Sequence, residues 1–128
     1  MTARGIGFIG VRIADVDAYA RTVALYRDAL GMTVTRDDGD RSVRFILPDG
    51  TALHVYGPGD VDHVWFGQQA CVGLSVDDVQ ATRLALEGAG IELLDDMEED
   101  DTDAWFHYRA PDGSVQEVIG PRRRVVSA

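Results

Sequence analysis

An internal repeat constrains the fold of this chain more than any other feature. Residues 48–58 and 111–121 are identical at six of eleven positions and lie 63 residues apart. The same separation aligns residues 10–16 with residues 73–79. Two matches at one separation indicate a structural unit that occurs twice. Because the chain has 128 residues, each copy takes up about half of it.

Both copies predict the same order of elements. In the first copy, alternating apolar residues predict a strand at 8–13, and Asp15 or Asp17 can cap the helix that follows. An apolar stripe recurs along this helix at helical spacing, and Gly31 ends it. The stripe consists of Tyr19, Val23, Tyr26 and Leu30. The remaining strands of the copy are predicted at 33–36, 42–47 and 51–56.

The second copy repeats this order. It predicts a strand at 71–76, a helix at 78–87 and three strands near 91–94, 105–109 and 114–119. The predicted unit is therefore βαβββ, and two such units make an α+β protein.

The charge of the chain excludes some partners. It carries 22 acidic and 12 basic residues, for a formal net charge of −10, and every basic residue is Arg. Such a charge repels nucleic acid and anionic membranes, so neither is an expected partner. The sequence has no Lys, which removes Schiff-base and P-loop lysine chemistry. A lone cysteine, Cys71, excludes an internal disulfide framework, and the sequence shows no signal-peptide or membrane-spanning pattern. A cytoplasmic protein is therefore expected.

A run of acidic residues precedes the last two predicted strands. Seven of the nine residues 95–103 are acidic. Because neighbouring like charges repel each other, the run predicts a solvated, mobile loop. It has no turn glycine at the spacing that a calcium loop needs. The three basic residues 122–124 either pair with this run or fray as a short tail.

Several motifs together resemble the vicinal oxygen chelate superfamily. They are the helix end Tyr26-Arg27-Asp28-Ala29-Leu30-Gly31-Met32, the turn Pro48-Asp49-Gly50 and the second copy of that turn, Pro111-Asp112-Gly113, which continues to Glu117. The superfamily includes glyoxalase I, bleomycin-resistance proteins, extradiol dioxygenases and fosfomycin-resistance transferases. The resemblance implies two tandem βαβββ modules that form one glyoxalase/bleomycin-resistance-type domain with a shared cleft, and it implies a homodimer. The expected boundaries are a single domain at 1–128 with a first module at 5–57, a linker at 58–69, a second module at 70–121 and a tail at 122–128.

The resemblance also implies metal positions on the first and last strands of each module. The repeat alignment places these positions at Phe8, His54, Cys71 and Glu117. Phe8 has no ligand atom, so the usual set is broken. His54, Cys71 and Glu117 could still hold one divalent metal, with Zn the best match to a thiolate and Fe, Mn or Ni the other candidates.

The alternative is a metal-free site, which is the main expectation because Phe8 breaks the ligand set. In that case Cys71 is a small buried apolar side chain. His54 and Glu117 then form a hydrogen-bonded pair, each favouring the charged form of the other. Such a pair can act as a catalytic general acid and base, or it can anchor a bound ligand.

Other residues are candidates for ligand binding. Along strand 105–109, Trp105, His107 and Arg109 share one face and are expected to line the cleft or its mouth, where they suit an acidic or aromatic ligand. The alternative is a solvated edge with Trp105 at a dimer interface. Arg12 shares its face with Phe8, and Tyr56 shares its face with His54, so both complete the candidate ligand-binding set.

Three residues of the predicted linker are expected at the surface. Trp65 and Phe66 are expected to be exposed, as a lid or as a subunit contact. His63 is expected on the surface because acidic residues flank it.

Two functions remain open. The first is a small-molecule enzyme of the vicinal oxygen chelate type, a lyase, isomerase or dioxygenase that acts near His54 and Glu117. The alternative is a metal-free protein that sequesters a hydrophobic or aromatic compound such as an antibiotic. Both act on or bind a small organic molecule in the cleft between the modules, and the type of reaction stays unassigned.

Overall fold

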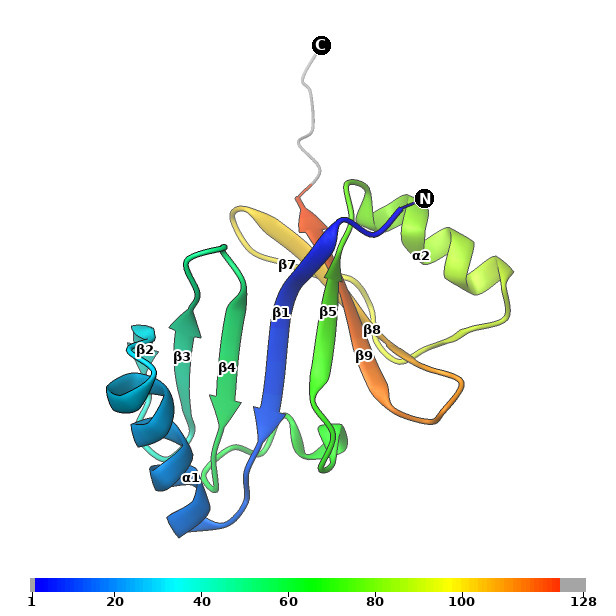
Figure 1. Ribbon diagram of the computed structural model, residues 1–128. Helices are drawn as coiled ribbons and strands as arrows, with labels where there is room; N and C mark the ends of the chain where they lie inside the picture. The colour runs from blue at the N-terminus through cyan, green and yellow to red at the C-terminus, as the bar shows by residue number, and fades with distance from the viewer. Residues whose placement is uncertain (1, 123–128) are drawn as a thin grey trace. The chain divides into compact units, whose positions relative to one another are not determined.

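The structure is a computed structural model, and it describes residues 2–122 (Figure 1). The chain divides into two compact units. We call Phe8–Cys71 the N-terminal unit, and residues 2–7 together with 72–122 the C-terminal unit. The predicted linker at 58–69 lies within the N-terminal unit. Residues 123–128 of the predicted tail lie outside the described residues.

The N-terminal unit contains one sheet and one long helix. Its elements are β1 (Gly5–Arg12, whose first three residues belong to the other unit), α1 (Val16–Ala24), the π-helical turn η1 (Leu25–Ala29), β2 (Thr33–Asp37), β3 (Ser42–Ile46), β4 (Ala52–Tyr56) and the 3-10 turn η2 (Val64–Phe66). The strands lie in the order β2–β3–β4–β1. β3 is antiparallel to β2 and β4, and β1 is parallel to β4.

The C-terminal unit has the same arrangement. Its elements are β5 (Cys71–Ser75, whose first residue belongs to the N-terminal unit), α2 (Val79–Gly88), β6 (Glu92–Leu93), β7 (Glu98–Glu99), β8 (Asp103–Arg109) and β9 (Val115–Pro121). The strands lie in the order β6–β8–β9–β5, with β7 also paired to β8. β9 is parallel to β5 and antiparallel to β8. This order matches β2–β3–β4–β1, so the predicted α+β fold and the βαβββ repeat are confirmed.

Aspartates cap both helices. The carboxylate of Asp15 accepts a hydrogen bond from the backbone N–H of Ala18 at 2.8 Å, and Asp78 accepts one from Ala81 at 2.9 Å. These bonds satisfy N–H groups that have no partner within the first turn of a helix. Asp15 rather than Asp17 is thus the N-cap of α1.

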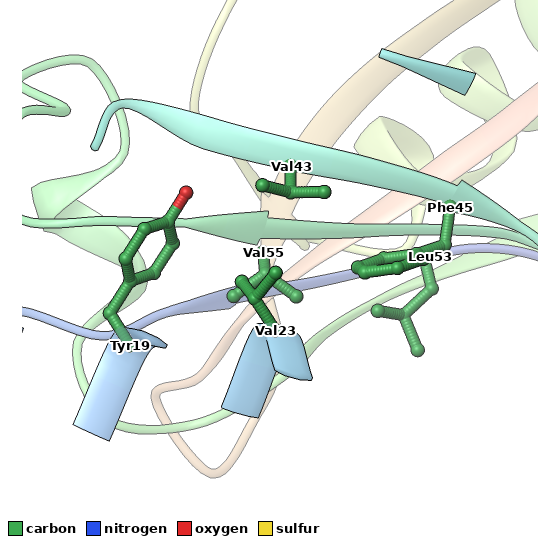
Figure 2. Close-up of a cluster of buried hydrophobic side chains, with 6 residues drawn as sticks. All are labelled: Tyr19, Val23, Val43, Phe45, Leu53 and Val55. Atoms are coloured by element: carbon green, nitrogen blue, oxygen red, sulfur yellow. The ribbon is translucent and has the colours of Figure 1, made fainter. Parts of the chain in front are cut away.

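The core of the N-terminal unit lies between α1 and the sheet (Figure 2). Strand alternation places every second side chain of β3 and β4 on this face. The buried cluster consists of Tyr19 and Val23 from α1, Val43 and Phe45 from β3, and Leu53 and Val55 from β4. The opposite face of the same two strands therefore carries Ser42, Arg44, His54 and Tyr56.

One member of the predicted helical stripe is wrong. Leu30 is 59% exposed, although Tyr19 and Val23 are buried as predicted and Tyr26 packs against the core. The reason is the π-helical turn η1, in which the N–H of Leu30 donates to the carbonyl of Leu25 at 2.9 Å. A bond over five residues widens the turn, so the next apolar position rotates away from the core. Met32 packs against the core after this turn.

The core of the C-terminal unit is smaller and lies under α2. Phe106, which is fully buried, and Ala104 from β8 pack with Val118 from β9 and with Val76 and Val79 at the start of the helix. Tyr108 also packs against this cluster, so Phe106 and Tyr108 lie on the helix side of β8, opposite the face that Trp105, His107 and Arg109 share.

The prediction of a mobile loop for the acidic run 95–103 is wrong for part of the run. Its residues Glu98–Glu99 form β7 and pair with β8. The carboxylate of Asp100 accepts hydrogen bonds from the backbone N–H groups of Thr102 and Asp103. The guanidinium of Arg122 lies 3.4 Å from Glu99. This contact agrees with the first alternative for residues 122–124, pairing with the acidic run. Strand pairing and this cation offset the repulsion that favoured an open loop.

Within the described residues, the model has no helix that is both long and apolar enough to cross a membrane.

Candidate functional site

A largely buried cluster of three titratable groups lies in the C-terminal unit. It consists of His107 on β8, Glu117 on β9 and Asp95 between β6 and β7. Figure 1 shows the two long strands β8 and β9. The register of these strands places His107 directly opposite Glu117. His107 Nε2 lies 3.0 Å from Glu117 Oε1. On its other side, His107 Nδ1 lies 2.7 Å from Oδ2 of Asp95, and the backbone N–H of His107 donates to Asp95 Oδ1 at 2.7 Å. The imidazole is therefore held between two carboxyl groups.

Burial and hydrogen bonding set the proton affinity of this cluster. Burial raises the pKa of Glu117, and the hydrogen bond from His107 offsets only part of that effect. For His107, burial acts to lower the pKa, but the hydrogen bonds to Glu117 and Asp95 outweigh it and raise the pKa. Both shifts act in the same direction. Glu117 and His107, coupled in a buried place, hold their protons to higher pH than separate groups would.

Glu117 offers one free oxygen. The residue is only 4% exposed. Its Oε1 faces His107, whereas its Oε2 is buried and has no hydrogen-bond partner among the described residues. Buried polar atoms nearly always have a partner, and exceptions mark functional sites or places for a ligand or water. Glu117 Oε2 is therefore an acceptor that the described residues leave unused.

The N-terminal unit holds a cluster of rings on the sheet face that points away from α1. The ring of Phe8 meets the ring of His54 edge-on, with centroids 5.0 Å apart. His54 Nδ1 lies 3.1 Å from the hydroxyl oxygen of Tyr56, and Tyr56 stacks on His63 with centroids 3.7 Å apart. Phe66 closes the cluster with an edge contact to Tyr56. These residues make one largely buried aromatic layer.

Burial lowers the pKa of His54 to about 4, with further lowering from the charge of Arg44 and from the neighbouring His63. His54 is thus neutral at pH 7. This is the opposite of the direction expected for an imidazole paired with a carboxylate. The carboxylate of Glu117 hydrogen-bonds to His107 instead.

Arg12 and His63 share one carboxylate. Asp60 Oδ1 lies 2.8 Å from His63 Nδ1, and Asp60 Oδ2 lies 3.5 Å from Arg12 Nε. Asp60 also accepts a hydrogen bond from the backbone N–H of His63. This bonding, with the stack on Tyr56, draws His63 into a half-buried place, so the prediction of a surface histidine is wrong. Phe66 is buried as well and does not form an exposed lid, whereas Trp65 is 40% exposed.

The remaining predicted site residues have various surroundings. Cys71 is fully buried. The indole N–H of Trp105 donates to Glu98 at 3.0 Å, and the guanidinium of Arg109 pairs with Glu92 at 3.1 Å. Trp105 and Arg109 share a strand face with His107, as predicted, but surface carboxylates occupy their polar atoms.

The metal-ligand set predicted from the family resemblance has no geometric support. The described residues contain no group of three or more His, Cys, Asp or Glu side chains that could hold a metal ion. At the implied position, Phe8 places a hydrocarbon ring against His54. Glu117, the only implied ligand with a side-chain oxygen, faces His107. His54 and Cys71 belong to one unit and Glu117 to the other, so this set stays a prediction. We derive no chemical step through a metal.

Sequence reasoning missed three residues of the two clusters. Asp95 was treated as one member of an acidic run, and Asp60 as a flanking charge. Arg44 was assigned to the correct strand face but given no role. A signal for Arg44 was present, because the repeat aligns it with His107. No sequence signal distinguished Asp95 from its acidic neighbours.

These features define an α+β protein of two βαβββ units with largely buried titratable side chains on the sheet faces that point away from the helices. The chain belongs to the Glyoxalase/Bleomycin resistance protein/Dioxygenase superfamily, since the model of that family matches residues 5–118. A search of the curated proteins finds no match.

Solved structures with the same fold include methylmalonyl-CoA epimerase from Mycobacterium tuberculosis. That protein is 18% identical with a TM-score of 0.67, over 94% of this chain and 90% of the epimerase chain. A variant of the Streptomyces coelicolor epimerase in complex with 2-nitronate-propionyl-CoA is 19% identical with a TM-score of 0.64, over 95% and 100%. A superfamily member from Vibrio splendidus 12B01 is 18% identical with a TM-score of 0.63, over 94% and 100%. At these identities the likeness shows the fold alone.

Proposed function

We propose that this chain binds a small organic molecule and exchanges a proton with it through the carboxyl group of Glu117. The observation that carries the proposal is that the two oxygens of Glu117 have different surroundings. One oxygen is held by His107, and the other is buried and has no partner among the described residues. A fixed carboxyl group with one oxygen available is the geometry that a general acid or base needs.

The proton affinity of the cluster supports the same role. A general acid or base works best when its pKa lies near the working pH, and burial raises the pKa of Glu117 towards that range. His107 then acts as a positioning residue that fixes the carboxyl plane. Asp95 fixes the orientation of the imidazole ring through its ring and backbone hydrogen bonds. An isomerisation fits these groups, since a proton taken from a C–H bond by Glu117 and then returned leaves no net change in atoms or electrons.

A deuterium-exchange assay tests this role. Candidate carbon acids, among them the methylmalonyl-CoA that a structurally similar epimerase binds, are incubated with the protein in D2O. Proton NMR then follows loss of the C–H signal. We expect exchange with the wild-type chain and at least a hundredfold slower exchange with Glu117→Gln, which keeps the shape of the side chain but cannot accept the proton. Glu87→Gln, the same change at an exposed residue of α2, is the matched control and should exchange at the wild-type rate. Exchange that persists in Glu117→Gln would contradict the proposal.

Sequestration without turnover is the second candidate. The neutral His54 and the surrounding rings of Phe8, Tyr56 and Phe66 favour an aromatic or hydrophobic compound. Tight binding of such a compound, with no exchange into any candidate, would favour this function over proton transfer.

The proposed proton transfer uses no metal. Elemental analysis of the purified protein tests this, and we expect less than stoichiometric Zn, Fe, Mn and Ni. One equivalent of metal that is lost in His54→Ala would instead establish the predicted set of His54, Cys71 and Glu117.

A homodimer and a cytoplasmic location are further parts of the proposal. The family resemblance supports the first, and the lone cysteine supports the second. The half-exposed ring of Trp65 is a candidate for the subunit contact. Light scattering after size-exclusion chromatography measures the mass, and a monomer would remove the dimer from the proposal.

A further inference from the structure

Two arginines face each other on the side of the N-terminal sheet that points away from α1. The register of β2 and β3 pairs Arg36 with Arg44. An irregularity in β2 between Val34 and Arg36 produces this register, because it shifts Arg36 to the position opposite Arg44. Like charges placed directly opposite each other on a sheet destabilise it unless something neutralises them.

A cavity of about 240 Å³ opens at this place. Three arginines line it: Arg36, Arg41 and Arg44. Tyr56 and His63 from the ring cluster form another part of its wall. In a chain with a net charge of −10, a quarter of all basic residues gather around one cavity.

The carboxylates of the cavity wall have partners of their own or face solvent, and one of them already pairs with a cavity arginine. Asp38 pairs with Arg36 at 2.9 Å. Asp60 is bonded to His63 and lies near Arg12, as described above. Asp62 is exposed to solvent. No carboxylate of the described residues is within ion-pair distance of Arg41 or Arg44.

Arg44 carries an unsatisfied donor. Its Nε is buried and has no hydrogen-bond partner among the described residues. A buried guanidinium N–H that lacks an acceptor is costly, and an anion is the acceptor that suits it best. A carboxylate or phosphate group would satisfy this donor and would also neutralise the opposed pair of arginines.

We propose that this cavity is a binding site for the anionic group, a carboxylate or a phosphate, of a small ligand, with Arg44 as its main contact. Arg41 and Arg36 supply further positive charge at the mouth. The site lies within one unit, and it does not depend on the proton transfer proposed for Glu117.

Anion titrations test the proposal. Inorganic phosphate and malonate are titrated separately into the wild-type protein at constant ionic strength set with chloride, and backbone NMR shifts are followed. We expect saturable shifts at residues 36–44 and 54–63 with at least one of the two probes. If phosphate binds at least tenfold more tightly, the natural ligand carries a phosphate group. If malonate does, it carries a carboxylate.

Three variants make the test specific. Arg44→Gln should weaken binding at least tenfold, and Arg41→Gln should weaken it severalfold, since each removes a charge-assisted contact. Arg21→Gln is the matched control, because Arg21 is a highly exposed arginine of α1 that pairs with Asp17. The affinity of this variant for both anions should equal that of the wild type. If Arg44→Gln does not fold, the exposed Arg41→Gln and the charge-conserving Arg44→Lys carry the test. Absence of saturable binding of both probes, or affinity unchanged in the Gln variants of Arg44 and Arg41, would overturn the site.

Discussion

In the N-terminal unit, strands β3 and β4 place Arg44 opposite His54, whereas in the C-terminal unit the corresponding strands β8 and β9 place His107 opposite Glu117. The repeat aligns Arg44 with His107 and His54 with Glu117. Each unit thus has one imidazole in the same row of its sheet, with a cation beside one imidazole and a carboxyl group beside the other.

The neighbours, rather than burial, separate the two histidines. Burial acts to lower the pKa of both. For His54 the nearby Arg44 and His63 add to that effect, and its pKa falls to about 4. For His107 the hydrogen bonds to Glu117 and Asp95 reverse it. The same row of the sheet therefore holds a neutral ring in one unit and a proton-holding ring in the other, although the two histidines stand on strands that do not correspond in the repeat.

The largest expected effect follows removal of the proton-holding ring. His107→Ala leaves the carboxyl groups of Glu117 and Asp95 without their partner, one of them deeply buried. Breaking a buried pair from one side costs about 3–5 kcal/mol of unfolding free energy, measured by urea denaturation at pH 7. Arg109→Ala is the control on the same strand face, and its exposed pair with Glu92 should cost at most about 1 kcal/mol. Equal losses in the two variants would show that the buried cluster contributes nothing special.

A smaller effect is expected in the ring cluster of the N-terminal unit. A Cβ at Gly10 would lie 2.8 Å from Phe8 Cζ and 2.9 Å from Phe66 Cε2. Gly10→Ala should therefore lower the unfolding free energy by about 1–3 kcal/mol, through overpacking against two rings. Gly88→Ala in α2 is the matched control, because a Cβ there meets no atom within 4 Å and the helical propensity of Ala should raise stability by about 0.5–1 kcal/mol. A neutral Gly10→Ala would mean that the rings are loosely packed.

Asp95→Asn should be milder than His107→Ala. The amide keeps one acceptor for His107 but removes the negative charge that favours the imidazolium. We expect a loss of about 1–2 kcal/mol and a lower pKa of His107, followed by NMR titration of its ring protons. An unchanged titration would show that Glu117 alone sets the proton affinity of the ring.

The smallest effect concerns the dependence of stability on pH. The pKa of His54 is lowered in the folded state, so its contribution is complete above the unfolded value of about 6.5 and is lost as the pH falls towards 4. The pKa of His107 is raised, so its contribution is complete below the unfolded value and is lost as the pH rises through the folded pKa. Arg44→Gln should raise the pKa of His54 only in part, because burial is the larger cause. NMR titration of both rings measures these shifts, and a His54 pKa near 6.5 in the wild type would remove the contrast between the two units.

The order of elements in each unit could be predicted because it depends on local patterns. Asp15 and Asp78 cap helices, and apolar residues alternate along β3 and β8 in both copies. Those signals lie within a few residues of one another in the chain. The π-helical turn that exposes Leu30 was not visible, since helical spacing alone does not show where a turn widens.

The sequence by itself determined the doubled α+β unit, the family resemblance, and the strand positions of His54, His107 and Glu117. Only the tertiary structure decided what each of these side chains contacts. Asp95 reaches His107 across twelve residues of chain, and Asp60 reaches Arg12 across forty-eight. The physical reason is that a pattern of residue types sets which face a side chain occupies, whereas proton affinity depends on atoms within a few ångströms. Those atoms come from segments that only folding brings together.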